Sequence, residues 1–270
     1  MMERFSLVKS ATTTSTIIDF PNVLAIRRGK YLVRLAQNQA EVDIALRLRF
    51  AIFNVELGEG LAKSFASGKD EEPFDLRCEH LLLIDQQANQ IIGTCRLRVH
   101  DKHKTVADCF SSTRFNLTTL PANVFHHSVE FGRVCISKSH RNKDSFGLLW
   151  YFLSHYAQQK QMRYLLGCCA MNSQDPLAGG QVFEWLLQSG YVHTEYKVVP
   201  KPGSKCIFYK PLLGKSARAL PSTLHSYLRF GARVCGLPAL DRDFRTINFF
   251  TLLPLEEITR NRTHLLSRAS

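Results

Sequence analysis

The sequence predicts a mixed α/β fold in which helices flank a central sheet. The first observation is the order of the predicted elements, which is strand, helix, two strands, strand, helix, strand, helix and two strands. The second is the absence of a G-x-G-x-x-G motif after the first strand, which excludes a dinucleotide-binding fold. The third is composition, because 45% of the 270 residues are hydrophobic and no run reaches the roughly 18 apolar residues of a membrane span.

The first predicted elements are a strand and an amphipathic helix. After an arm over residues 1–28, the alternation typical of a strand occurs at Tyr31, Val33 and Leu35. Asn38 precedes Glu41 by three positions, the spacing of a helix capping box. Apolar residues then recur at spacings of three and four, at Val42, Leu46, Phe50, Phe53 and Leu57. Gly58 and Gly60 end this predicted helix. A polar loop over 59–74 is expected to be mobile.

The middle of the chain contains further strands and a second helix. Strands are predicted at 81–85 and 91–99 as a hairpin, and at 128–136, after an irregular stretch over 101–127. A helix capped by Asp144 or Ser145 follows, with one apolar stripe at Phe146, Leu149, Trp150, Leu153 and Tyr156.

The last third contributes a buried strand at 164–170 and a helix that opens at Asp175 and Pro176. Segments 191–199 and 206–209 are predicted to pair as closing strands. A basic helix from Pro221 to Arg233 and an apolar tail segment over 247–255 follow.

Charge and cysteine usage restrict the class of protein. The net charge is +12, and residues 200–270 alone hold 12 Lys or Arg and 4 Asp or Glu, a net charge of +8. Such a balance predicts an anionic partner or simply a soluble basic surface. The eight cysteines form no C-x-x-C pair, so we expect no zinc or other metal site and a reducing cytoplasm. The first 20 residues lack the apolar core of a signal peptide.

An E-x-x-R motif within the buried strand 128–136 is the main candidate for chemistry. Glu and Arg are almost never fully buried unless paired, so Glu130 and Arg133 indicate either a structural ion pair or a functional site. Three positions apart, they would lie on opposite faces of a regular strand. Gly132 between them permits a bulge that turns both toward one site.

A basic loop over 137–143 connects this strand to the next helix. Free N–H groups, the positive end of the helix dipole and cationic side chains converge there, which is typical of a phosphate site. A solvated turn is the other interpretation.

Five motifs occur in an order that resembles the haemolysin-like branch of the GNAT acyltransferases, which includes the ornithine-lipid N-acyltransferases. The motifs are R-x-x-x-F (Arg49 to Phe53), F-D-x-x-x-E-H-L-L (Phe74 to Leu82), G-T-x-R-L (Gly93 to Leu97), E-F-G-R-x-C (Glu130 to Cys135) and L-L-G-C-x-x-x-x-x-x-D-P (Leu165 to Pro176). The order is similar, more distantly, to that of acyl-homoserine-lactone synthases. The resemblance covers about residues 30–210, and the tail from Gly236 to Leu255 also resembles this branch.

The resemblance implies a GNAT-like, mostly antiparallel central sheet flanked by helices. It implies an N-terminal arm (1–28), an acyltransferase domain (29–212) and a basic helical C-terminal extension (213–270). The implied reaction moves a fatty acyl group, with or without a 3-hydroxyl, from acyl carrier protein to the α-amino group of an amino acid.

The resemblance also assigns roles to residues on the acceptor side. An amine is largely protonated near neutral pH and needs a base before it attacks a thioester. Glu130 is the implied base, with its pKa set by burial and by Arg133. In the implied acceptor site, Arg49 and Arg96 clamp a carboxylate, and Asp75 and Glu79 receive a cationic side chain. Phe53 is also implied to contact the substrate.

On the donor side, backbone N–H groups from Val134 to Ile136 are implied to hold the thioester oxyanion. The implied phosphate ligands are Lys138, Arg141 and Lys143. The usual glycine-rich loop is replaced by R-N-K-D-S-F-G from Arg141 to Gly147, which favours the 4′-phosphopantetheine arm of acyl carrier protein over coenzyme A. No cofactor is expected to stay bound. A tyrosine is expected to protonate the thiolate, either Tyr164 or Tyr191.

Two other functions fit the same residues. One is synthesis of a diffusible signal such as an acyl-homoserine lactone. The other is a catalytically silent protein that binds acyl carriers or membrane. Nucleic-acid binding is not expected, because the basic residues are not interleaved with aromatic ones. We expect a cytoplasmic protein whose basic surface attracts acidic acyl carrier protein and can contact the anionic inner face of the membrane.

Overall fold

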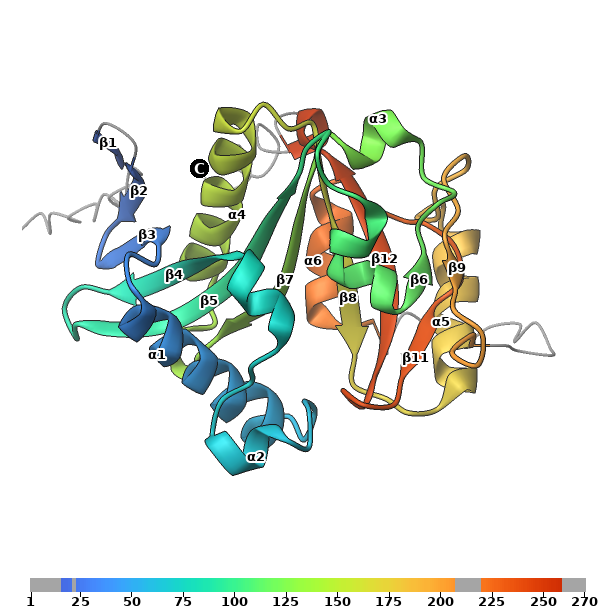
Figure 1. Cartoon of the computed structure of the whole chain (residues 1–270), viewed down its shortest axis with the longest axis horizontal. Helices are drawn as coiled ribbons and strands as arrows, with labels where there is room; N and C mark the ends of the chain where they lie inside the picture. The colour runs from blue at the N-terminus through green and yellow to red at the C-terminus, as the bar shows by residue number, and fades with distance from the viewer. Residues whose placement is uncertain (1–15, 21–22, 207–219, 259–270) are drawn as a thin grey trace, which may run out of the picture.

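A ten-stranded sheet dominates the computed structural model, which describes residues 16–20, 23–206 and 220–258 (Figure 1). Its strands are β1 (Thr16–Phe20), β2 (Val23–Arg28), β3 (Tyr31–Leu35), β4 (Glu79–Asp85), β5 (Gln90–His100), β7 (Ser128–Ile136), β8 (Tyr164–Met171), β10 (Arg233–Val234), β11 (Ala239–Asp241) and β12 (Thr246–Pro254). They lie in the order β1-β2-β3-β4-β5-β7-β8-β12-β10, with β11 beside β12. A second sheet pairs β6 (Phe115–Asn116) with β9 (Val199–Pro200).

Helices pack against both halves of the large sheet. The α-helices are α1 (Gln39–Phe50), α2 (Ser64–Ser67), α3 (Ala122–Phe125), α4 (Lys143–Gln159), α5 (Pro176–Gln188) and α6 (Ser222–Arg229). A π-helical segment, η1 (Ala51–Glu56), continues α1, and short 3₁₀ turns are η2 (Pro73–Arg77), η3 (Val106–Asp108), η4 (Phe110–Thr113) and η5 (Lys138–His140). No helix within the described ranges is both long and apolar enough to span a bilayer.

The expected mixed α/β fold, with a mostly antiparallel central sheet flanked by helices, is confirmed. Every neighbouring pair of strands in the large sheet is antiparallel except β7–β8. The predicted first strand, hairpin, E-x-x-R strand and buried strand are β3, β4–β5, β7 and β8. The predicted caps of α1 and α5 are also confirmed, because the side chain of Asn38 accepts from the Glu41 N–H and that of Asp175 from the Leu177 N–H.

Several predicted boundaries are wrong. The cap of α4 is Asn142, whose side chain accepts from the N–H groups of Asp144 and Ser145, the two predicted caps. The loop over 59–74 contains α2 and the fully buried Asp70. The irregular stretch over 101–127 contains three helical turns and β6.

The extension predicted over 213–270 is not wholly helical, because the large sheet continues past residue 212. The tail segment forms β12, which pairs with β8 along its whole length, and α6 ends at Arg229, before Arg233. The predicted closing strand pair is absent from the described part of 191–209, where β9 pairs with β6. Parts of the expected arm and extension (1–15, 21–22, 213–219 and 259–270), and the end of the second closing strand (207–209), lie outside the described residues. Long-range strand pairing of this kind leaves no local pattern in a sequence.

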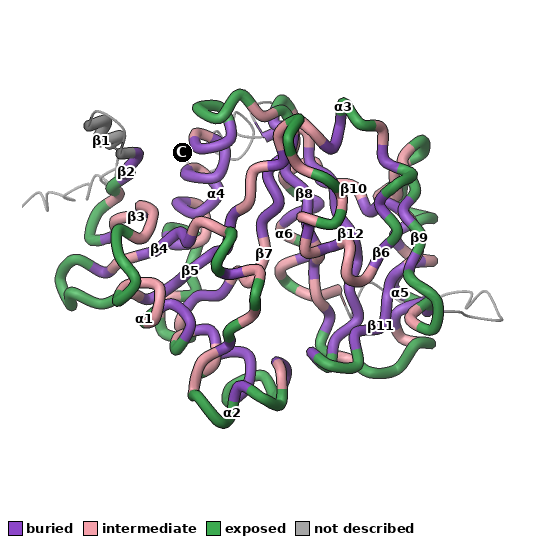
Figure 2. Tube along the Cα trace, viewed as in Figure 1, coloured by how far each residue is buried: buried purple, intermediate pink, exposed green. Residues whose placement is uncertain are grey.

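The sheet splits between its two parallel strands. β7 and β8 pair only from Ser128 to Glu130 and from Tyr164 to Leu166. Beyond these residues the strands diverge toward the bottom of Figure 1, with β1–β5 on one side and β12 on the other. Buried residues run along both halves, whereas most exposed residues lie in loops and on outer helix faces (Figure 2). The split leaves an unpaired edge of β7 facing the interior.

Gly167 lies where the two strands begin to part, and we predict that Gly167→Ala destabilises the fold. An added Cβ would stand 2.2 Å from the carbonyl oxygen of Phe131, a backbone atom that moves only with β7. We expect the free energy of unfolding in urea to fall by about 1–3 kcal/mol. Gly132→Ala is the matched control, because its added Cβ meets no atom within 4 Å. An equal loss in both variants would contradict this packing explanation.

Candidate active site

A cavity of about 430 Å³ occupies the split between β7 and β8. Residues 130–134 of β7 line one side, and residues 168–172, from β8 and just beyond it, line the other. Aromatic side chains contribute much of the remaining wall, namely Phe53, Phe110, Tyr227 and Phe244. Its volume lies in the range of small-molecule sites. Five predicted site residues line it: Phe53, Arg96, Glu130, Arg133 and Val134.

The predicted bulge in β7 exists, and Arg133 rather than Gly132 takes the unusual backbone conformation. Gly132 and Cys135 pair with Arg96 and Thr94 of β5, so two residues of β7 face the single residue Cys95. Arg133 has φ of +52°, a left-handed conformation that normally costs a non-glycine residue free energy. Its guanidinium lies 4.0 Å from the ring centroid of Phe244 and 5.1 Å from that of Phe110.

Six buried or nearly buried charges form a closed ring of alternating sign around the bulge. Following the ring, the contacts are Arg49–Asp70 (2.8 Å), Asp70–Arg133 (3.1 Å), Arg133–Glu72 (2.7 Å), Glu72–Arg96 (3.1 Å), Arg96–Asp75 (3.1 Å) and Asp75–Arg49 (2.8 Å). Burial raises the pKa of the Asp75 carboxyl, but Arg49 and Arg96 outweigh it and hold that pKa well below its usual range. We call this set the charge ring.

The charge ring uses groups that were expected to bind the acceptor. Arg49 and Arg96 pair with protein carboxylates, so they do not stand free as a clamp for a substrate carboxylate. Asp75 is bound by the same two arginines, and the Glu79 carboxylate accepts from the hydroxyl of Tyr156. Neither acid lines the cavity between β7 and β8. The ion pair between Glu130 and Arg133, one of the two interpretations of the motif, does not form, since each has other partners among the described residues.

Glu130 is held by a segment that sequence reasoning left unassigned. One carboxylate oxygen accepts from the Phe110 N–H (2.7 Å), and the other accepts from the N–H and hydroxyl of Ser111 (2.7 and 2.6 Å). Burial raises the pKa of Glu130, but His100 and these donors prevail and lower it to about 2. A carboxylate with so low a pKa is a weak proton acceptor near neutral pH.

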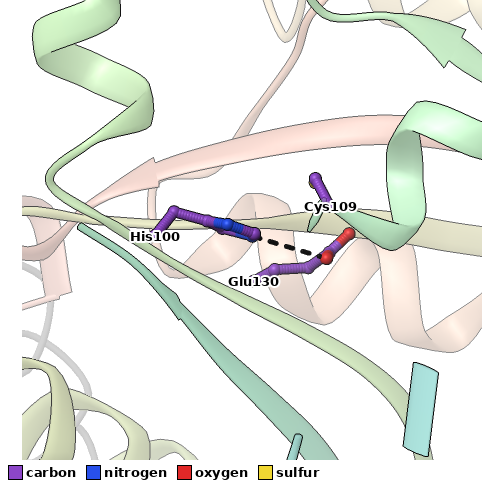
Figure 3. Close-up of side chains that lie close together, drawn as sticks. All are labelled: His100, Cys109 and Glu130. Carbon is purple, nitrogen blue, oxygen red and sulfur yellow. Dashed lines mark ion pairs between the residues drawn. The ribbon is translucent and has the colours of Figure 1, made fainter. Parts of the chain in front are cut away.

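Figure 3 shows the side chains of His100, Cys109 and Glu130 lying close together. All three are of types that can bind metals, and their possible ligand atoms lie within 4.8 Å of one another. His100 Nε2 lies 3.5 Å from a Glu130 oxygen, and both oxygens already accept hydrogen bonds. Burial raises the pKa of the Cys109 thiol well above its usual value, so the sulfur stays protonated. In this cluster, Glu130 is held by the hydrogen bonds from Phe110 and Ser111, and the imidazole of His100 lies beside its carboxylate.

The predicted donor loop lies at the end of β7, and its residues differ in availability. Arg141 donates to both carboxylate oxygens of Glu56 (2.6 and 2.9 Å) and to the carbonyl of Ile136. Lys138 and Lys143 are exposed. Asn142 accepts from two N–H groups at the start of α4, so the exposed lysines are the cationic groups through which this loop can meet an anion.

Sequence reasoning missed other residues of this site. Tyr227 of α6 lines the cavity, whereas the predicted tyrosines, Tyr164 and Tyr191, do not. Glu59, just beyond η1, also lines it and is only 7% exposed. Burial raises the pKa of Glu59 to about 7, although the charge of Arg133 opposes the rise. Glu59 lies in a stretch that the sequence predicts to be a polar loop, and only the fold shows that this side chain is buried.

Residues 48–151 of this chain match the family model described as an acetyltransferase (GNAT) domain. Over 86% of its length, the chain is 26% identical to an L-ornithine N(alpha)-acyltransferase of Agrobacterium fabrum strain C58, of which it covers 83%. It is 27% identical to the enzyme of the same name from Rhizobium meliloti strain 1021, with 84% of this chain and 80% of the relative covered. The resemblance stated from the motifs is thereby confirmed.

A solved structure shares the same fold. FeeM, an N-acyl amino acid synthase from uncultured soil microbes, superposes with a TM-score of 0.52 over 86% of this chain and 95% of its own. The identity is 12%. At that identity the likeness extends to the fold alone.

The charge ring predicts a large cost when one of its members is lost, and Asp75→Asn tests it. The variant leaves Arg49 and Arg96 buried with one negative charge fewer, so we expect the free energy of unfolding at pH 7 to fall by about 3–5 kcal/mol. The ionised carboxylate stabilises the fold above its unfolded-state pKa, and this contribution is lost as pH falls through its depressed folded-state pKa. The difference between wild type and variant is therefore constant above about pH 5 and shrinks below about pH 4.

The control for this measurement is Asp43→Asn. Asp43 pairs with Lys69 at 2.6 Å near the surface, with 38% of its side chain exposed, so its loss should cost much less. Urea unfolding followed by circular dichroism at several pH values measures both. A loss for Asp75→Asn no larger than that for Asp43→Asn would show that the ring is not a linked network.

Proposed function

We propose that this protein is an N-acyltransferase that moves a fatty acyl group from acyl carrier protein to the α-amino group of an amino acid, with L-ornithine as the acceptor. The observation that carries the proposal is the apolar cavity at the unpaired edge of β7. The family model supports acyl transfer, and the names of the relatives support ornithine as acceptor. A cytoplasmic location, with contact to the anionic inner face of the membrane, belongs to the same proposal.

The edge of β7 suits an extended thioester arm. A pantetheine chain carries amide groups, and the strand beyond Glu130 has backbone groups that β8 does not use. The arm enters past Ser137 and lies along β7, with its thioester at the bulge. There the backbone N–H of Val134, or of Ile136, stabilises the oxyanion of the tetrahedral intermediate.

The reaction then needs a neutral amine in contact with the thioester carbon. The amine nitrogen bonds to that carbon, the C–S bond breaks, and the thiolate takes a proton as the amide forms. Burial raises the pKa of Tyr227 well above its usual value, so its hydroxyl stays protonated beside the leaving sulfur. Phe53, Phe131 and Met171 provide apolar contacts for the acyl chain.

The charge distribution favours acyl carrier protein over coenzyme A. Lys138 and Lys143 lie in the loop that follows β7 and are exposed, and two exposed lysines match one phosphate better than the three of coenzyme A. The net charge of +12 attracts an acidic carrier.

The first experiment is mass spectrometry of lipids extracted from cells with and without the expressed protein, fed labelled ornithine, glycine, lysine or glutamine. We expect one new N-acyl amino acid that carries the ornithine label, because a transferase joins the intact amino acid to the acyl chain. Cells with the empty vector are the control. A labelled product only in the medium would favour the diffusible-signal function, and no product from folded protein would contradict N-acyl transfer.

A second test is charge reversal at the donor loop, Lys138→Glu with Lys143→Glu. We expect the KM for palmitoyl–acyl carrier protein to rise roughly tenfold at low salt, with little change in the KM for ornithine, because the lysines attract only the donor. Added salt should reduce the difference in this donor KM between the variant and the wild type. Lys102→Glu, an exposed lysine just beyond the opposite end of β5, is the control. A larger effect on ornithine than on the donor would overturn the assignment of this loop.

A further inference from the structure

One carboxylate in the cavity is left unused by the rest of the structure. Three carboxylates line the cavity, those of Glu59, Glu130 and Asp241. Glu130 accepts three hydrogen bonds, and Asp241 accepts two from Arg114 (2.6 and 2.9 Å). None of the described residues donates a hydrogen bond to the Glu59 carboxylate. We propose that Glu59 accepts the proton from the ammonium group of the acceptor amino acid, an inference that rests on the proposed function.

The backbone that carries Glu59 is fixed on three sides. The π-helical segment η1 ends in a turn in which the Glu59 N–H donates to the carbonyl of Phe53 (2.8 Å). The next N–H, from Gly60, donates to the carbonyl of Phe244 (3.0 Å), and Asn172 donates to the carbonyl of Leu57 (2.8 Å). The backbone at Glu59 is therefore held in place by hydrogen bonds to η1, to the residue after β8 and to the turn before β12.

Gly60 shows that this turn is closely packed. It has φ of +84°, and an added Cβ would stand 2.4 Å from the side-chain oxygen of Asn54. Asn54 in turn donates to the carbonyl of Leu61 (2.9 Å). π-Helical segments are frequent at functional sites, and this one positions Phe53, Leu57 and Glu59 on a single cavity wall.

The surroundings of Glu59 suit a proton acceptor. The charge of Arg133 on β7 acts on Glu59, and Arg245, in the turn before β12, donates to the carbonyl of Gly58 next to it. Asp241 of β11, which pairs with Arg114, lines the same cavity. Phe53, Leu57 and Phe244 contribute apolar wall beside the carboxylate. Burial raises the pKa of Glu59 to about 7, whereas the pKa of Glu130 is about 2. Glu59 therefore has the affinity for a proton that Glu130 lacks near neutral pH.

The proton balance of the step is complete. The ammonium N–H bond breaks and its proton passes to Glu59, which leaves a neutral amine. The amine attacks the thioester carbon, and the nitrogen loses its second proton as the C–N bond forms and the C–S bond breaks. One proton goes to the thiolate and one to solvent, so that Glu59 is again ionised for the next turnover.

The test compares kcat against pH for wild type, Glu59→Gln and Glu59→Asp, with palmitoyl–acyl carrier protein and L-ornithine. We expect the wild-type kcat to rise with pH through an ionisation near pH 7 and then level off, because only the ionised carboxylate accepts a proton. Glu59→Gln should lose this rise and about 10²–10⁴-fold of kcat. Glu59→Asp should keep the rise with a lower plateau.

A second acceptor separates a catalytic role from a structural one. In the ornithine analogue with an aminooxy group in place of the α-amino group, the nucleophile is unprotonated at neutral pH and needs no base. We expect Glu59→Gln to lose far less activity with this analogue than with ornithine. Glu71→Gln, the same substitution at an exposed site outside the cavity, is the matched control, and unfolding midpoints check that each variant folds.

Each other outcome has a definite meaning. An unchanged pH profile in Glu59→Gln, or an equal loss of activity with both acceptors, would overturn the role of Glu59. Acyl transfer by the wild-type protein would still support the proposed function in that case. Wild-type protein that acylates none of the acceptors would remove the proposed function and this inference together. Loss of the acidic limb in Glu130→Gln instead would assign the proton transfer to Glu130.

Discussion

The charge ring is the constraint on which the rest of the site depends. It joins α1, the segment from Asp70 to Asp75, β5 and the bulge of β7. The left-handed backbone of Arg133 is stabilised because its guanidinium meets two carboxylates and the ring of Phe244. Buried ion pairs contribute little net stability compared with apolar packing, but removing one partner is costly. The ring therefore fixes one conformation of the bulge more than it adds stability.

The balance of charge within the ring determines what remains for chemistry. Three arginines face three carboxylates, so none of the six presents an unmatched charge to a substrate. The same holds for Glu130, whose oxygens are occupied by the segment at Phe110 and Ser111. Groups that the cavity offers a reactant include the backbone edge of β7, the apolar walls, the hydroxyl of Tyr227 and the carboxylate of Glu59.

Local sequence patterns predicted local structure but did not predict the long-range contacts. The caps at Asn38 and Asp175, the hairpin of β4 and β5, and a bulge in β7 all follow from residues within a few positions of one another. The central place of β12 depends on pairing with β8, some 80 residues earlier in the chain. Partners in the charge ring are likewise 21 to 63 residues apart, and no spacing rule connects them.

Glu59 and Glu130 show why residue type and motif do not identify a base. Both line one cavity and both are buried, and the motif draws attention to Glu130 because a charge in an apolar strand is conspicuous. Their surroundings act in opposite directions. Donors converge on Glu130 and stabilise its ionised form, whereas burial without a donor favours the protonated form of Glu59. Divergent pKa values in one cavity are how a protein assigns different roles to two carboxylates. By that criterion Glu130 supports the segment at Phe110 and Ser111, and Glu59 exchanges the proton.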